Sequence, residues 1–245
     1  MNPVRACLEL FRMEMLMRRD GFLTIFEMRV LFSMGLILGF GYFIPEITEA
    51  EALFLTTGAA AQAVVAVGLI MLPRKLSQDK AEGRLDYMMT LPVSREAYLI
   101  AQILYVAILS LPATALAVAF GAWHYDLPLT VEPALLPVAV LAVLATAGVG
   151  VAAAMFSPSP QLTDAVAQFL TFYVLLFAPV LFPKEYLPSL FRHVSVYLPP
   201  TYVADALRGS LTDLPGTHLA RSMAAMAGFT LVSLAASAVS VRRRG

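Results

Sequence analysis

The side chains of this sequence that could do covalent or metal chemistry are few and widely separated. The 245 residues include one cysteine, Cys7, and three histidines, His124, His193 and His218. A single cysteine excludes an internal disulfide and a paired-cysteine metal or redox site, and the histidines do not have the spacing of metal ligands. Ser195 lies near His193, but no acid or oxyanion-binding motif accompanies the pair. We therefore expect no catalytic residue and no metal site, and we expect that the chain is not an enzyme.

The sequence also lacks the motifs expected of a nucleotide-binding protein or an ion-coupled carrier. The sequence has no phosphate-binding loop of the form GxxxxGK[ST], and its formal net charge of zero gives no basic field for nucleic acid. Ion-coupled carriers usually place ionisable residues deep within their spans, whereas the large polar residues there are Gln62, Gln102 and Gln168. We expect no cofactor in this chain, no nucleic-acid partner and no secondary transporter.

Composition places the chain in a membrane. Its hydrophobic content is 59%, its charged content 14% and its mean hydropathy +0.76, against roughly 25% charged residues in soluble domains. A spanning helix needs about 20 apolar residues. We predict an all-α polytopic protein with a single membrane domain, residues 1–245. An interfacial helix, 1–21, precedes six transmembrane helices: 22–43, 53–72, 97–120, 134–156, 165–182 and 222–241.

The N-terminal helix is predicted to be amphipathic. Val4, Leu8, Phe11 and Met15 fall on one helical face, which is typical of a helix lying on a membrane surface and contacting lipid. Charged residues interrupt this segment too early for a cleaved signal peptide.

The first predicted span differs from the others because it contains Glu27 and Arg29. Both lie within about two turns of its inner end. We expect these side chains to snorkel to the surface or to pair with the interfacial helix. A mid-membrane ion site is the alternative.

Charge distribution gives the orientation. Lys and Arg gather at the N-terminus, between the second and third spans and in the C-terminal tail, whereas the first two loops on the other side hold only acids. By the positive-inside rule, both termini are predicted to be cytoplasmic. Small residues indicate close helix contacts: Gly35 and Gly39 form GxxxG, and Ala142 to Ala154 form a ladder at every fourth position. Each set could pack within one subunit or at a dimer seam.

The polar segment 74–94, RKLSQDKAEGRLDYMMTLPVS, separates two uncharged runs. Leu85, Met88 and Met89 recur at helical spacing, and Pro92 stops the helix before Ser94 can cap the next one. This pattern predicts a short amphipathic helix that docks on a partner; a solvated connector is the alternative.

The last outer segment, 183–221, is too apolar for a simple loop. Thr201 is predicted to cap a helix from Tyr202 to about Leu211, in which Asp205 and Arg208 can pair. We expect one or two short helices that dip back into the outer leaflet.

Two stretches together resemble a known family. EGRLDYMMTLPVSR, residues 82–95, resembles the cytoplasmic loop of permease subunits of type-2 ATP-binding-cassette (ABC) exporters, and LPPTYVADALRGSL, residues 198–211, resembles their outer segment. Arg84 stands where the family commonly has Thr, and Asp86 where it has Glu. The resemblance implies a multi-pass protein of the bacterial cytoplasmic membrane. It also implies that ATP and Mg bind a separate ATPase subunit.

On this basis we expect a homodimer joined to two ATPase copies, surrounded by membrane lipid, that exports an amphipathic or lipid-like drug, antibiotic, lipid or glycan. A haem-exporter-like permease and a non-transport assembly factor are the alternatives. The residues expected to couple to the ATPase are Glu82, Gly83, Arg84, Leu85, Asp86, Met88, Met89 and Pro92. Those expected to line a substrate path at the dimer seam, in spans one, two and five, are Phe26, Phe32, Gln62, Phe169, Phe172 and Tyr173.

Overall fold

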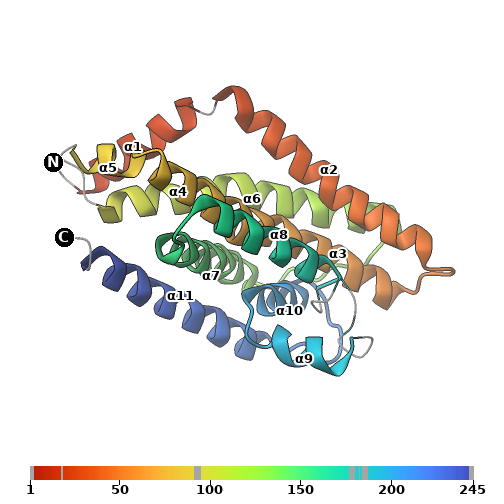
Figure 1. The fold of residues 1–245 in the computed structure, drawn as a ribbon. Helices are drawn as coiled ribbons and strands as arrows, with labels where there is room; N and C mark the ends of the chain where they lie inside the picture. Colours follow the sequence, from red (N-terminus) through yellow and green to blue (C-terminus); the bar gives the residue numbers. More distant parts are fainter. Residues whose placement is uncertain are drawn as a thin grey trace.

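The computed structural model describes residues 3–17, 19–90, 95–176, 180–181, 183 and 187–242, and its regular elements in that part of the chain are all helices. Long helices lie side by side in a bundle (Figure 1). Their bounds are α1 Pro3–Met17, α2 Arg19–Phe43, α3 Glu49–Val65, the π-helix η1 Ala66–Met71, α4 Leu72–Ala81, α5 Arg84–Thr90, α6 Arg95–Tyr125, α7 Leu135–Phe156, α8 Pro160–Leu176, α9 Ser189–Ser195, α10 Pro199–Leu211 and α11 Leu219–Arg242.

Within the described residues, five helices are long and apolar enough to cross a membrane. This confirms the all-α polytopic class. The predicted span 165–182 corresponds to α8, which begins earlier, at Pro160, and has 17 residues to Leu176. Because residues 177–179 and 182 lie outside the described part, the count of six spans stays a prediction. The five helices cover Gly21–Phe43, Glu49–Ala81, Ala97–Tyr125, Leu135–Phe156 and Leu219–Ala236.

The helix that contains the second predicted span is longer than that span. Thr48 and Glu51 form a capping box that starts α3, and the chain then stays helical through η1 and α4 for 33 residues, to Ala81. It continues past Leu72, the predicted end of the span, while the point at which the helix leaves the membrane stays a prediction. Lys75 and Asp79, which follow Leu72, are buried within the protein.

The ladder of small residues in α7 packs within this chain. A Cβ on Gly68 of η1 would collide with Thr146, and a Cβ on Gly150 would collide with the carbonyl oxygen of Gly68. Close backbone approach of α7 to η1 therefore requires glycine at both positions. Gly35 and Gly39 differ, because nothing lies within 4 Å of a Cβ placed on either.

The two ends of the bundle carry different short elements (Figure 1). The helices α1 and α5 lie at the end where α11 finishes, and α9 and α10 lie at the other end. The two short helices expected in the last outer segment are present as α9 and α10, and their position in the outer leaflet stays a prediction. Thr201 is not the cap, because α10 begins at Pro199 after Leu198, where proline suits the first helical turn. The Thr201 hydroxyl instead donates to the Ser195 carbonyl, at 2.8 Å.

Candidate functional site

The predicted short helix in the polar segment is present as α5. It follows Gly83, whose φ of 71° is the left-handed conformation that glycine adopts without strain. Pro92 and Ser94 lie outside the described residues, as do the side chains of Asp86 and Met89. The local pattern of glycine followed by helically spaced apolar residues was thus sufficient to place this helix.

The apolar side of α5 packs on the chain's own body. Met88 is 6% exposed and belongs to the main hydrophobic core, and Leu85 packs against that core. These side chains were expected to project into a partner, but in this structure they hold α5 in place. Among the described side chains of α5, the exposed large apolar one is Tyr87, at 64%, which the sequence pattern did not single out.

A buried ionic network lies beside α5, centred on Lys75 of α4. Lys75 Nζ is 2.7 Å from Glu14 Oε1 of α1 and 3.3 Å from Asp79 Oδ2 of α4. It also donates to Gln102 Oε1 of α6 at 2.5 Å, and Gln102 Nε2 donates to Glu14 Oε2 at 3.4 Å. All four side chains are less than a tenth exposed. The network therefore joins α1, α4 and α6.

Asp79 extends this network to α5. The Tyr98 hydroxyl of α6 donates to Asp79 Oδ2 at 3.2 Å, and Arg84 Nε of α5 lies 3.6 Å from Asp79 Oδ1. Arg84 Nη2 is also 3.8 Å from Glu82 Oε2. Burial of charge is tolerated only when each charge is paired and hydrogen-bonded. Here the pairing partners come from four separate helices, so a shift of α5 changes the environment of α1 and α6.

This network was missed in the sequence because the helix was expected to contact lipid through its apolar face, and its other residues were not assigned partners in the bundle. Leu8 of that apolar face is 57% exposed, whereas Leu10 and Glu14 are buried within the protein. The spacing of Lys75 and Asp79, four residues apart, was the available signal of an ion pair. Nothing local indicated that Glu14 would join them.

A second set of polar contacts ties α4 to the start of α8. Arg74 Nε lies 3.4 Å from Asp164 Oδ1, and Lys80 Nζ donates to the Ser157 carbonyl at 2.8 Å. The Thr163 hydroxyl donates to Ser77 Oγ at 2.9 Å. Helix α4 is therefore held by α1 and α6 through the buried network and by Ser157 and α8 through this second set of contacts.

The residues expected to line a substrate path lie in contrasting places. Gln62 and Tyr173 are buried, so neither faces an open path within one chain. Phe32, Phe169 and Phe172 are exposed apolar side chains on α2 and α8. The remaining one, Phe26, packs on the main core.

The opposite end of the bundle holds a second buried cation, Arg208 of α10. Its Nε donates to Thr57 Oγ1 at 3.2 Å and its Nη2 to the Val180 carbonyl at 3.1 Å. The guanidinium carbon lies 3.3 Å from the centre of the Phe54 ring. Desolvation lowers the pKa of Arg208 to about 9, opposed by the charge of Asp205. Arg208 therefore stays protonated at neutral pH.

The expected pairing of Arg208 with Asp205 does not form. Asp205 Oδ2 instead accepts hydrogen bonds from Ser222 Oγ at 2.7 Å and from the His218 backbone at 3.4 Å. The two side chains leave the helix in different directions, one to α3 and one to the start of α11.

Comparison with known proteins identifies a family. The model of the family described as ABC-2 type transporter matches residues 6–212. The matched range includes both stretches that carried the resemblance. A search of curated proteins found no match.

Proposed function

Since the chain belongs to the ABC-2 type transporter family and is a multi-pass membrane permease, we propose that it exports an amphipathic or lipid-like substrate with energy from a separate ATPase. Permeases of this family associate with an ABC ATPase subunit. The observation that carries the proposal is the buried network of Glu14, Lys75, Asp79 and Gln102, with Arg84 attached. It connects the exposed helix α5 to helices α1 and α6.

We place the ATPase contact on the exposed side of α5, with Tyr87 at its centre and the charges of Glu82 and Arg84 beside it. A rigid element can transmit force only if it is fixed to what it moves. Met88 and Leu85 supply that fixation through the core, and Arg84 supplies it through Asp79. The roles of Asp86, Met89 and Pro92 in this contact stay predictions.

The experiment is to replace Tyr87 by Asp and to measure co-purification of the ATPase with the permease. We expect Tyr87→Asp to insert normally and to lose most of the bound ATPase and of the transport, because a charge replaces a large apolar contact at a partner surface. Tyr197→Asp is the matched control, since Tyr197 is 78% exposed near α9 and α10. Equal binding by both variants would contradict the coupling role of α5.

We further propose two permease copies with two ATPase copies. The open GxxxG face of α2 and the exposed aromatic residues of α2 and α8 support a seam between copies at which the substrate path is completed. The mass of the detergent-solubilised complex tests this arrangement. A monomeric permease that transports with one ATPase would exclude it.

A further inference from the structure

The outward side of α6 ends on Trp123, which is the only tryptophan of the sequence. Leu116 and Ile108 are exposed apolar side chains of this helix, and Trp123 is 77% exposed near its C-terminal end. Leu116 precedes Trp123 by almost two helical turns, so the two side chains lie on the same side of α6. The described helices of the bundle leave this side uncovered.

Aromatic residues gather in the last turns of α6. The ring of Phe120 lies 6.0 Å from that of Trp123, between centroids. It also stacks on His124, at 5.8 Å, and His124 meets Tyr125 edge to face, at 4.6 Å. The Tyr125 hydroxyl donates to the Ile37 carbonyl of α2, at 2.9 Å. The last turn of α6 is therefore fixed to α2, and the position of Trp123 is fixed with it.

Trp123 points away from α2. Successive residues of an α-helix are rotated by about 100° around its axis, so residues two apart point about 160° apart. Since Tyr125 is directed at α2, Trp123 lies on the opposite side of α6. It is therefore outside the seam that we proposed for a second copy, which involves α2 and α8. Membrane lipid is the neighbour that suits an uncovered apolar side of a spanning helix.

The position of Trp123 along α6 suits the boundary between lipid and water. The apolar span Ala97–Tyr125 ends two residues after it, and the exposed Asp126 follows. The span of α2, which is fixed to the same turn, ends at Phe43. Tryptophan is enriched at membrane interfaces because its ring is apolar while its N–H needs a polar partner.

We propose that Trp123 anchors the protein in the phospholipid interface of the leaflet at the α10 end of the bundle. The segment that follows α6 lies at that end, because the Thr130 N–H donates to the carbonyl of Leu211, the last residue of α10. The indole ring packs on the upper acyl chains, and its N–H donates to headgroup oxygens or water. This inference concerns the membrane and does not depend on which cargo is exported.

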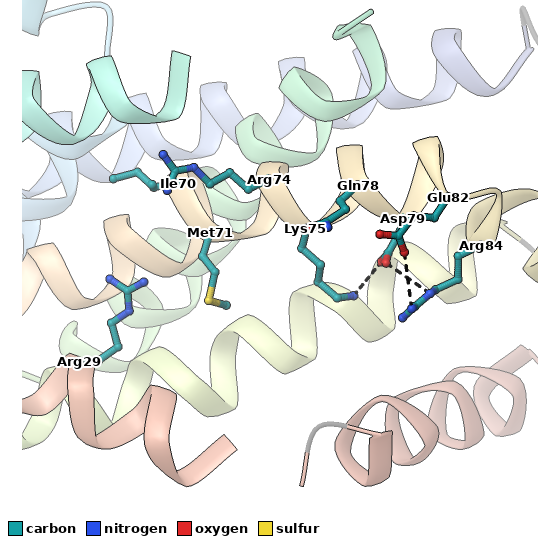
Figure 2. Close-up of a pocket in the computed structure, with 9 residues that line it drawn as sticks. All are labelled: Arg29, Ile70, Met71, Arg74, Lys75, Gln78, Asp79, Glu82 and Arg84. Atoms are coloured by element: carbon teal, nitrogen blue, oxygen red, sulfur yellow. Dashed lines mark ion pairs between the residues drawn. The ribbon is translucent and has the colours of Figure 1, made fainter. Parts of the chain in front are cut away.

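The anchor also gives the depth of the buried network at the other end of α6. Gln102 precedes Trp123 by 21 residues, which is about 32 Å at 1.5 Å per residue and close to the hydrocarbon thickness of roughly 30 Å. Lys75, which donates to Gln102 and pairs with Asp79 (Figure 2), therefore lies at the opposite membrane surface. On this proposal, the second span leaves the hydrocarbon near Lys75.

The test is the fluorescence of the full chain in vesicles of phosphatidylcholine brominated at either the headgroup end or the methyl end of its acyl chains. Wild type needs no added reporter, since Trp123 is the only tryptophan. It should lose more fluorescence with bromine at the headgroup end. Stronger quenching at the methyl end, quenching by aqueous acrylamide alone, or quenching by neither would place the ring in hydrocarbon, in water or under protein. Each of these three results would overturn the proposal.

Two variants in a Trp123→Phe background test the depth along α6. Leu116→Trp moves the reporter about 10 Å toward the bilayer centre and should be quenched more by bromine at the methyl end. Ile100→Trp moves it about 35 Å, to the opposite surface, and should again be quenched more at the headgroup end. Both positions are exposed, so each protein should still melt cooperatively. Deep quenching of Ile100→Trp would place Gln102 within the hydrocarbon and contradict the proposed depth.

Discussion

Among the side chains that the structure describes, the two buried cations, Lys75 and Arg208, lie at opposite ends of the bundle and are stabilised in different ways. Lys75 is paired with two carboxylates, Glu14 and Asp79, that belong to different helices. Arg208 is held by neutral acceptors and by the ring of Phe54. The first arrangement depends on opposite charges that must stay together, and the second on fixed dipoles around one charge.

This difference indicates different mechanical roles. An ion-pair network with several acids and several cations can exchange partners when a helix moves, because each charge has a second partner nearby. A guanidinium enclosed by carbonyl groups and an aromatic ring has no such alternative. We therefore expect movement at the end that carries α5 and rigidity where α10 packs on α3.

Breaking the Lys75 network should have the largest effect on stability. Lys75→Met removes the buried cation that pairs with both Glu14 and Asp79, and loss of one partner of a buried ion pair typically costs about 3–5 kcal/mol. The free energy of unfolding in detergent, from denaturant titration, measures this loss. The double variant Lys75→Met with Glu14→Gln should recover part of it, since a neutral amide replaces a carboxylate that has lost Lys75. A double variant as unstable as the single one would contradict the pairing.

Removing the Arg208 cation should cost less. Arg208→Met deprives neutral groups of their donor, namely the Thr57 hydroxyl and the carbonyls of Val180 and Phe54, and about 1–3 kcal/mol is typical for an unsatisfied buried polar group. Arg221→Met removes an exposed cation near the start of α11 and should be close to neutral. If Arg208→Met is more damaging than Lys75→Met, the contrast between the two ends is wrong.

The ion pair of Arg74 with Asp164 should have the smallest effect. Its side chains are 37% and 63% exposed, and exposed pairs contribute about 0–1 kcal/mol. Asp164→Asn should therefore change the unfolding free energy by no more than about 1 kcal/mol, in the same denaturant titration. A larger loss would mean that the contact of α4 with α8 is part of the buried network.

The sequence predicted the parts of the fold that depend on overall composition or on residues close together in the chain. Composition was enough for the polytopic all-α class, and Gly83 followed by Leu85 and Met88 was enough for α5. The continuation of the second helix beyond Leu72 was not predicted, since hydropathy cannot distinguish a charge facing water from one facing a buried partner. Lys75 and Asp79 are of the second kind.

The candidate site could not be assembled from the sequence, because its members are distant along the chain. Glu14 reaches Lys75 only because α1 packs against α6. The spacing of apolar residues within a helix does not show which other helix will pack against each of its faces. Similarly, the spacing of Asp205 and Arg208 permits a pair, but Ser222 and Thr57 offer each of them a tertiary partner.

The π-helix η1 determines the direction in which the side chains of the following helix, α4, point. A π turn takes up one more residue than an α turn, and one residue corresponds to about 100° of rotation around the axis. Residues after Met71 therefore face about 100° away from the direction that the apolar pattern of α3 would give them. If Ala66–Met71 wound as an α-helix with all of its residues kept, Lys75 and Asp79 would turn about 100° away from Glu14. Deleting one residue there would offset that change and keep their direction. The polar face of α4 meets its partners because the helix changes its winding just before the charges begin.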